Sequence, residues 1–323
     1  MRRLDCKDKK ILYELDANSR QSIQSIGRKV NLHKNVVLHR IRKLEESGII
    51  NNYFTIIDSS KLGYRSYRLN LLFQNTNDEI ISDIINHFVK YNNTWWVVST
   101  KGIYDFSTAI WVKNIEEFQR FWKQTLGKYH FFIREQTFSL YLELFSLRHS
   151  YLLIDKHLKS DRAKYEIVLG STSVDIDDID QNILQLMANN SRIPTIEISN
   201  KLNISAPTVR KRIRNLTELG VIRGFRINID HSKMGYKMFK IDMYLNDYKM
   251  RDKILDFIIK NPRLIYICNT LGYADLEFDL MVEEERQLHH ILDQIKSKFK
   301  GIIKYYDFIH EYKVHKVDYM PYK

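Results

Sequence analysis

A basic, amphipathic segment occurs twice in this chain, and the repeat restricts the possible folds more than any other feature of the sequence. Residues 31–53 read NLHKNVVLHRIRKLEESGIINNY, and residues 203–225 read NISAPTVRKRIRNLTELGVIRGF. A constant offset of 172 positions aligns Asn31 with Asn203, Arg40 with Arg212 and Gly48 with Gly220. The chain must therefore contain two copies of one folding unit, and the fold must accommodate both.

The similarity continues on both sides of this segment. LDCKDKKIL at 4–12 matches IDDIDQNIL at 176–184, and IIDSSKLGY at 56–64 matches NIDHSKMGY at 228–236. Each half is about 150 residues long, which is too long for a solenoid repeat and typical of a duplicated two-domain module. Residues 148–174 have no counterpart and end in the small, polar stretch LGSTSV, so we expect a linker there.

Hydrophobic periodicity predicts the same order of elements in both halves. The first half should begin with a helix that carries Ile11, Leu12 and Leu15 on one face, followed by helices over about 23–30 and 34–46. The second half repeats this order over about 178–188, 195–202 and 206–218, and a β segment follows each set. Strands and helices then alternate as β-α-β-β-α-β, a ferredoxin-like order. The predicted class is α+β, with a winged helix-turn-helix at 1–60, a ferredoxin-like domain at 61–147, the linker, a second winged helix-turn-helix at 175–232 and a second ferredoxin-like domain at 233–323.

The longer helix of each basic segment separates into an apolar face and a cationic face. Val37, Ile41 and Leu44 lie on one side, as do their equivalents in the second copy. Asn31 and Asn203 suit a left-handed turn between two helices. A helix presented in this way fits the major groove of DNA, where Arg and Asn side chains can bind base edges. The residues predicted to contact DNA are Lys34, Asn35, His39, Arg40, Arg42, Lys43, Ser205, Thr208, Arg210, Lys211, Arg212 and Arg214.

Composition agrees with a polyanionic partner. The chain has 51 Lys and Arg against 39 Asp and Glu, a formal net charge of +12, and basic chains favour nucleic acids. No apolar run approaches the roughly 20 residues of a membrane span, and the N-terminus does not resemble a secretory signal, so we expect a cytoplasmic protein without a membrane partner.

Nothing in the sequence indicates an enzyme, a metal site or a cofactor. The two cysteines, Cys6 and Cys268, are too few for a structural zinc site. His289 and His290 diverge on a helix, and no nucleophile–base or carboxylate pair is apparent. We interpret Trp95, Trp96 and Trp111 as strand and core residues.

These motifs resemble the Lrp/AsnC (feast/famine) family of transcriptional regulators over nearly the whole chain. The resemblance implies a winged helix-turn-helix joined to a ferredoxin-like domain that binds a small molecule, often an amino acid, and drives assembly. The family's Gly-x-x-Asp turn corresponds here to Gly102 and Asp105, and to Gly272 and Asp275, which are the expected effector residues. We expect the two halves to form an intramolecular pseudo-dimer and the chains to form homo-oligomers.

Two features depart from the family pattern. Most members carry one module per chain, and the first recognition helix has His33 where Ser is usual and Leu38 where a polar residue is usual. We therefore expect the second helix-turn-helix to dominate sequence recognition.

Two other functions remain open. One is a siroheme-decarboxylase-like enzyme on the same fold, although the corresponding stretch, WWVVSTKGIYDFSTAIWV, lacks the His and Arg residues that such enzymes use. The other is an effector-sensing scaffold that does not bind DNA.

Overall fold

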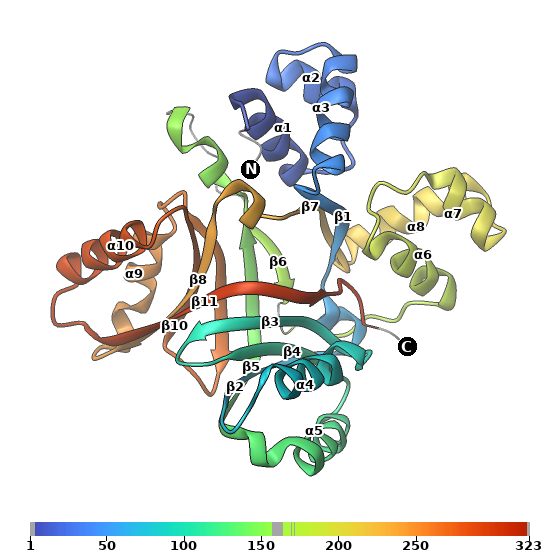
Figure 1. Cartoon of the computed structure of the whole chain (residues 1–323). Coiled ribbons are helices and arrows are strands. Elements are labelled where there is room, and N and C mark those ends of the chain that lie inside the picture. Colours follow the sequence, from blue (N-terminus) through green and yellow to red (C-terminus); the bar gives the residue numbers. More distant parts are fainter. Residues whose placement is uncertain (1–3, 157–163, 169, 171, 322–323) are drawn as a thin grey trace.

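Two three-helix units project from a central β structure in the computed structural model, which describes residues 4–156, 164–168, 170 and 172–321 (Figure 1). The first unit consists of α1 (Cys6–Ala17), α2 (Ile23–Val30) and α3 (Lys34–Glu46). The second consists of α6 (Asp178–Ala188), α7 (Thr195–Leu202) and α8 (Ala206–Glu218). The predicted helix positions are confirmed in both copies.

The turn between the last two helices of each unit depends on a left-handed asparagine. Asn31 has φ 54° and Asn203 has φ 51°, and each residue ends the preceding helix. Asn tolerates this conformation better than most residues because its short side chain can bond locally. Both predicted turns are confirmed, and they set α3 and α8 in equivalent orientations.

A two-stranded ribbon joins the helical units. β1 (Ile50–Ile57) follows α3, β7 (Ile222–Ile229) follows α8, and the two strands pair antiparallel. Phe54 lies opposite Arg226, its own counterpart in the repeat. The hydroxyl groups of Ser19 and Ser191, which are also equivalent positions, lie 2.7 Å apart. A local twofold pseudo-axis therefore passes through the ribbon.

Each half continues with the predicted β-α-β-β-α-β order. The first domain contains β2 (Arg65–Phe73), α4 (Asp78–Lys90), β3 (Thr94–Gly102), β4 (Phe106–Val112), α5 (Ile115–Tyr129) and β5 (Ile133–Leu147). The second contains β8 (Lys237–Leu245), α9 (Arg251–Ile258), β9 (Leu264–Leu271), β10 (Leu276–Val282), α10 (Glu285–Lys298) and β11 (Ile303–Val317). Short 3-10 turns lie at η1 (Ser59–Leu62), η2 (His130–Phe132), η4 (Ser232–Met234) and η5 (Tyr248–Met250).

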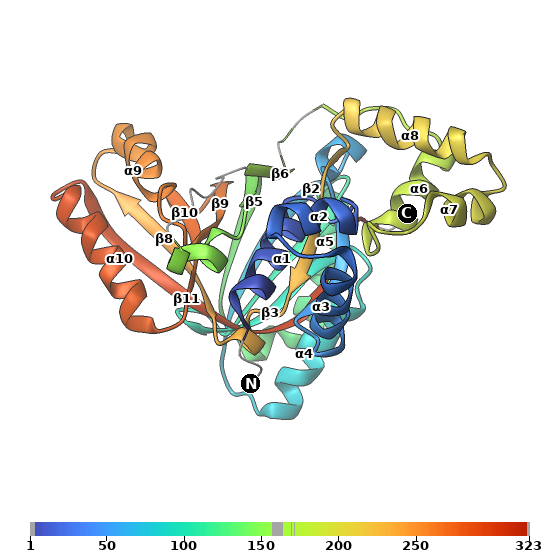
Figure 2. The ribbon, with the colours of Figure 1, turned by 90° about the horizontal axis from the view of Figure 1, so that it is seen from above.

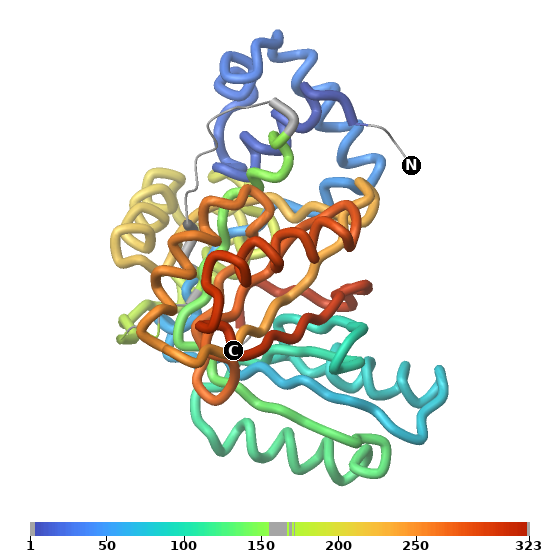
Figure 3. The backbone as a smooth tube through the Cα atoms, turned by 90° about the vertical axis from the view of Figure 1, so that its left-hand side faces the viewer, coloured from blue at the N-terminus to red at the C-terminus, as the bar shows by residue number. Residues whose placement is uncertain are grey.

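The two ferredoxin-like sheets join edge to edge. β3 pairs with β11, β9 pairs with β5, and β5 also pairs with β2, so eight strands form a closed ring in the order β2-β4-β3-β11-β8-β10-β9-β5. Closure leaves none of these eight strands with an unpaired edge along its whole length. Figure 3 shows the orange-to-red second half lying against the cyan-to-green first half. The expected intramolecular pseudo-dimer is present.

The helices cover the outside of this ring. α4 and α5 pack on the first sheet around Phe88, Phe106 and Phe121, and α9 and α10 pack on the second around Phe278 and Leu292. Figure 2 shows α9 and α10 at the opposite end of the molecule from α6–α8. The ring therefore has an apolar outer face, and its inner face carries many of the buried polar residues.

The segment expected to be a linker contains regular structure. η3 (Ser150–Lys156) and β6 (Lys164–Val168) lie within it, and β6 pairs with β5. Tyr151, Leu152 and Leu153 are buried in the same core as α1 and α3. Burial of three large apolar side chains stabilises this structure far more than a solvated linker would. No helix among the described residues is long and apolar enough to cross a membrane.

Candidate nucleic-acid interface

The exposed side of α3 presents most of the residues predicted to contact DNA in the first copy. Val37, Ile41 and Leu44 are buried beneath the helix. The opposite side is exposed to solvent and carries Lys34, Asn35, His39, Arg42 and Lys43. Val36 and Leu38 share this side and are 41% and 37% exposed, so part of the surface is apolar.

The exposed side of α8 is more uniformly polar. Val209 and Leu216 are buried, whereas Thr208, Arg210, Lys211 and Arg214 are exposed. Arg214 lies 3.8 Å from Glu218 in a fully solvated pair, which is a weak interaction that a phosphate or base could replace.

The two helices begin with caps of different quality. The Ser205 hydroxyl accepts a hydrogen bond from the Thr208 amide at 3.2 Å and lies 2.8 Å from the Thr208 hydroxyl. At the same place in α3, a His33 ring nitrogen accepts from the Asn35 amide at 3.4 Å. Ser is among the strongest N-cap residues, so the first turn of α8 is better fixed than that of α3.

Two of the predicted contact residues are engaged inside the protein. Arg40 donates to Asp5 at 2.7 Å and Asp8 at 2.8 Å, and Arg212 donates to Asp177 at 2.8 Å and Asp180 at 2.9 Å. Hydrogen bonds to Asp180 and Asp177 raise the pKa of Arg212. Each arginine thus ties the recognition helix to the N-terminus of the first helix of its unit. The expectation that these two side chains face DNA is corrected to a structural role.

The four residues predicted to bind an effector are found at two equivalent hairpin ends, 170 positions apart in sequence. The Asp105 carboxylate accepts from the Phe73 amide at 2.9 Å, and the Asp275 carboxylate accepts from the Leu245 amide at 2.8 Å. Gly102 has φ 135°, and a Cβ there would lie 2.6 Å from the Phe308 carbonyl oxygen. These contacts give all but Gly272 a role in holding the strands together.

The tryptophans predicted to be core residues line an internal cavity of about 510 Å³. Trp95 stacks on Trp111 with ring centroids 5.7 Å apart, and its indole N–H donates to the Ser66 hydroxyl at 2.7 Å. His289 and His290 lie on α10, where His289 is 3.8 Å from Glu285. Within the described part of the chain, no group of three or more His, Cys, Asp or Glu residues could hold a metal ion.

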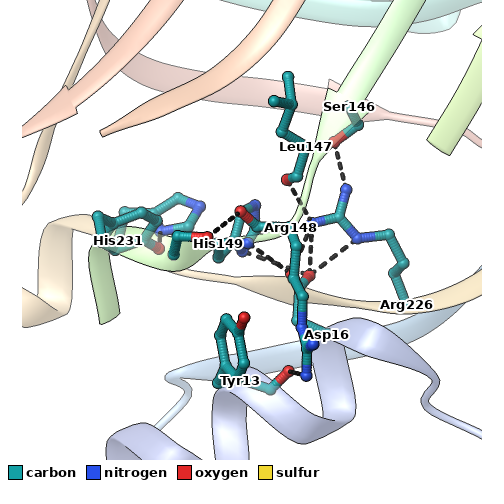
Figure 4. A network of polar contacts seen from close by, with 10 residues as sticks. Tyr13, Asp16, Ser146, Leu147, Arg148, His149, Arg226 and His231 are labelled. Carbon is teal, nitrogen blue, oxygen red and sulfur yellow. Dashed lines mark hydrogen bonds and ion pairs between the residues drawn. The ribbon is translucent and has the colours of Figure 1, made fainter. Parts of the chain in front are cut away.

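Sequence reasoning missed a buried ionic network that anchors the first helical unit (Figure 4). Arg226 on β7 donates from Nε to one oxygen of Asp16 at 2.9 Å and from a terminal nitrogen to the other at 2.7 Å. The His149 amide donates to Asp16 at 2.8 Å, and Arg148 lies over the Tyr13 ring. The equivalent positions hold Ala188 of the second half in place of Asp16 and Phe54 of the first half in place of Arg226. The available signal was the difference between the two copies, with Arg226 in β7 where β1 has Phe54.

Comparisons with known proteins agree with this geometry. A family model described as winged helix-turn-helix DNA-binding matches residues 4–51 and 176–223. The uncharacterized HTH-type transcriptional regulator PF1734 of Pyrococcus furiosus is 31% identical over 109 residues, which are 34% of this chain and 71% of that protein. The HTH-type transcriptional regulator LrpB of Bacillus subtilis is 29% identical over 120 residues, which are 37% of this chain and 80% of that protein.

One solved structure matches the whole arrangement. The siroheme decarboxylase NirDL, in complex with an iron–uroporphyrin III analogue, aligns with a TM-score of 0.64 and covers 98% of this chain and 94% of its own. The sequence identity is 12%. This likeness concerns the fold: two helical units on a ring made of two ferredoxin-like domains.

Proposed function

Because the chain belongs to the Lrp/AsnC family of helix-turn-helix transcriptional regulators, we propose that it is a sequence-specific double-stranded DNA-binding regulator in which one chain supplies two recognition helices. The observation that carries this proposal is the exposed cationic side of both α3 and α8, at equivalent places on either side of one ribbon. Pairs of recognition helices bind successive major-groove faces, and most such proteins obtain the pair by dimerisation.

The two helices have different roles in this proposal. Thr208, Arg210 and Arg214 on α8 offer donors to base edges, and a bidentate Arg–guanine contact discriminates by about 1–3 kcal/mol. Lys34, Arg42 and Lys43 on α3 bind phosphates, which position the protein without reading sequence. A covalent link between the two helices makes the second contact intramolecular and raises its effective concentration.

Fluorescence anisotropy with a labelled duplex at several salt concentrations tests DNA binding directly. The logarithm of the association constant should fall with the logarithm of the salt concentration, with a slope of about −0.9 per phosphate contact. Arg210→Ala should weaken binding at every salt concentration. Arg212→Ala is the matched control, because it removes a neighbouring charge that is paired with Asp177 and Asp180.

We expect Arg212→Ala to lower the melting temperature and to leave the affinity of the folded protein unchanged. Affinity that does not vary with salt, or an equal loss in both variants, would contradict the proposed interface. Absence of binding to any genomic duplex would favour the scaffold without DNA binding.

An amino acid or related metabolite as effector is a finer part of the proposal. Membership of the family supports it, and the Gly102–Asp105 and Gly272–Asp275 turns are its predicted location. A metabolite screen by thermal shift, repeated with Asp105→Ala and Asp275→Ala, tests it. Shifts that persist unchanged in both variants would place the effector elsewhere.

A second candidate is a siroheme-decarboxylase-like enzyme, favoured by the likeness in fold to NirDL over nearly the whole chain. A polycarboxylate tetrapyrrole needs cations to bind it, but Arg226 and Lys240 beside the cavity already pair with Asp16, Asp242 and Glu277. An absorbance scan after incubation with iron–uroporphyrin III distinguishes the two functions. A shifted tetrapyrrole band together with loss of carboxyl groups would favour the enzyme.

A further inference from the structure

The internal cavity lies between the inner face of the strand ring and the β1–β7 ribbon. Its volume of about 510 Å³ falls within the usual range for small-molecule sites. Aromatic side chains from four strands and the C-terminal segment supply much of its wall: Trp95, Trp96, Trp111, Tyr141, Tyr266 and Tyr319. Tyr312 and Val314 also line it and are 49% and 55% exposed, so the cavity reaches solvent beside them.

Two carboxylates line this cavity without a partner. Asp279 on β10 is 7% exposed and Glu311 on β11 is 9% exposed. Asp279 Oδ1 and Glu311 Oε2 are fully buried and have no hydrogen-bond partner among the described residues. An unpaired buried charge is costly, so this arrangement requires a physical explanation.

The strand register places both carboxylates on the same side of the sheet. Asp279 of β10 lies opposite Lys240 of β8. Glu311 of β11 lies opposite Met238, which is two residues before Lys240 on β8. Residues two apart on a strand point to the same face. Burial is the main cause that raises the pKa of the Glu311 carboxyl, and the charge of Asp279 raises it further. The two acidic groups therefore face the same cavity from either side of β8.

The nearby cations are already committed to other acids. Lys240 Nζ lies 2.7 Å from both Asp242 and Glu277, and Arg68 also pairs with Glu277. These two cations balance those two anions. Arg226 pairs with Asp16, and burial lowers the pKa of His231 to about 3, so this histidine is neutral. Lys313 also lines the cavity but is exposed at its rim.

We propose that this cavity binds a small organic amine, with its ammonium group between Asp279 and Glu311 and its apolar body against the tryptophans. Paired carboxylates supply the counter-charge that a buried ammonium group needs, and aromatic faces attract cations. The aromatic walls favour an organic cation over a bare metal ion, which would require several oxygen ligands. This site is separate from the turns at Asp105 and Asp275, and its occupancy does not depend on DNA binding.

Titration of the full-length chain with three probes of similar shape tests the charge requirement. The probes are phenethylamine, 2-phenylethanol and 3-phenylpropanoate, and the readouts are tryptophan fluorescence and calorimetry. We expect saturable binding of phenethylamine and at least tenfold weaker binding of the alcohol and the carboxylate. Equal responses to all three, or an equal response to magnesium chloride alone, would overturn the proposal.

Isosteric variants test the assigned residues. The double variant Asp279→Asn, Glu311→Gln should bind phenethylamine at least tenfold more weakly and should have a melting temperature at least as high as that of the wild type, because it removes unpaired buried charge. Trp111→Phe provides a second, independent variant and should weaken binding while keeping the preference for the amine. Asp252→Asn, Asp256→Asn is the matched acidic control, because both side chains are exposed, and it should bind as the wild type does. Undiminished binding by the folded double variant would overturn the assignment.

Discussion

Equivalent residues on the two recognition helices differ in chemistry at several exposed positions. Val36 and Leu38 of α3 correspond to Thr208 and Arg210 of α8, and the polar pairs His39/Lys211 and Lys43/Asn215 also differ. Arg42 and Arg214 are identical. The better-capped helix also has donors, Thr208 and Arg210, where α3 has the apolar Val36 and Leu38, so we predict that its arginine reads a base.

Arginine substitutions on the two helices should therefore have unequal effects. Arg214→Ala should cost about 1–3 kcal/mol of binding free energy at one operator position and relax the preference there. Arg42→Ala should weaken binding evenly across sequences, as a lost phosphate contact does. Affinities for one selected operator and for random duplex measure both effects. The assignment is reversed if Arg42→Ala abolishes discrimination and Arg214→Ala leaves it intact.

Asp279 makes the stability of the protein depend on pH. Burial raises its pKa to about 6, against the opposing effect of Lys240. Arg68, Asp242, Glu277 and Glu311 are the other charged or titratable groups around it. The folded chain therefore binds this proton more tightly than the unfolded chain, and the stability falls as the pH rises from about 4 to about 6.

Asp279→Asn should remove this penalty. At pH 7.5 the variant should exceed the wild type in free energy of unfolding by about 2–3 kcal/mol, and the difference should vanish near pH 4. Urea denaturation at the two pH values measures it. Asp252→Asn, which changes an exposed side chain, is the control and should show no such difference. A penalty that is the same at both pH values would show that Asp279 is ionised in the folded state throughout.

At the scale of elements, the repeat and its periodicity were sufficient to predict the helices and the ferredoxin-like order. Alternation along β8 places Phe239, Ile241 and Met243 on one face and Lys240 and Asp242 on the other. The sequence could not indicate that the polar face is buried against the other half. That information lies in contacts such as the one between Arg68 and Glu277, which are 209 positions apart.

The roles of Arg40 and Arg212 had a detectable signal. An Asp lies 35 positions before each arginine, and another lies 32 positions before it, in both copies. Because the arginine and both aspartates recur together, the pattern indicates that the three residues contact one another in each copy, in preference to an arginine that faces solvent. Periodicity within one helix cannot reveal it, because both acidic partners belong to another helix.

The anchoring of α1 can be tested by replacing Asp16 and Arg226 with the residue types found at the equivalent positions, Ala188 and Phe54. Asp16→Ala leaves Arg226 buried without its carboxylate and should cost about 3–5 kcal/mol of stability. Adding Arg226→Phe restores the pair Ala188 and Phe54 present at the equivalent positions and should recover much of that loss. Thermal and urea unfolding of the two single variants and the double variant complete the cycle. Additive losses would mean that the two residues do not interact.

At the scale of the whole molecule, the cores of both helical units are shared between the two halves. The core that holds α1, α2 and α3 includes Tyr236, Ile265 and Met281 of the second half. The core of the second helical unit includes Ile57 of β1. Three strand pairings, β1–β7, β3–β11 and β5–β9, also cross between halves.

We therefore expect the two halves to purify as a one-to-one complex when one cell produces them as separate polypeptides. The two polypeptides would comprise residues 1–148 and 149–323. The isolated halves should self-associate or aggregate, because each exposes unpaired edges at three strands. Light scattering after co-purification measures the stoichiometry. Two stable monomers that do not bind one another would show that the halves are independent domains.

The pseudo-axis through Phe54 and Arg226 has a consequence for the history of the molecule. In an assembly of two identical chains, a residue on the axis meets a copy of itself, so a buried Arg there would face another Arg. Gene fusion removed that constraint and let the two positions mutate separately, one to an aromatic residue and one to a buried cation with a single acidic partner. Once both had changed, separation into two identical chains would bring like residues together again. The duplication is therefore difficult to reverse, because the substitutions that followed it would destabilise an assembly of two identical chains.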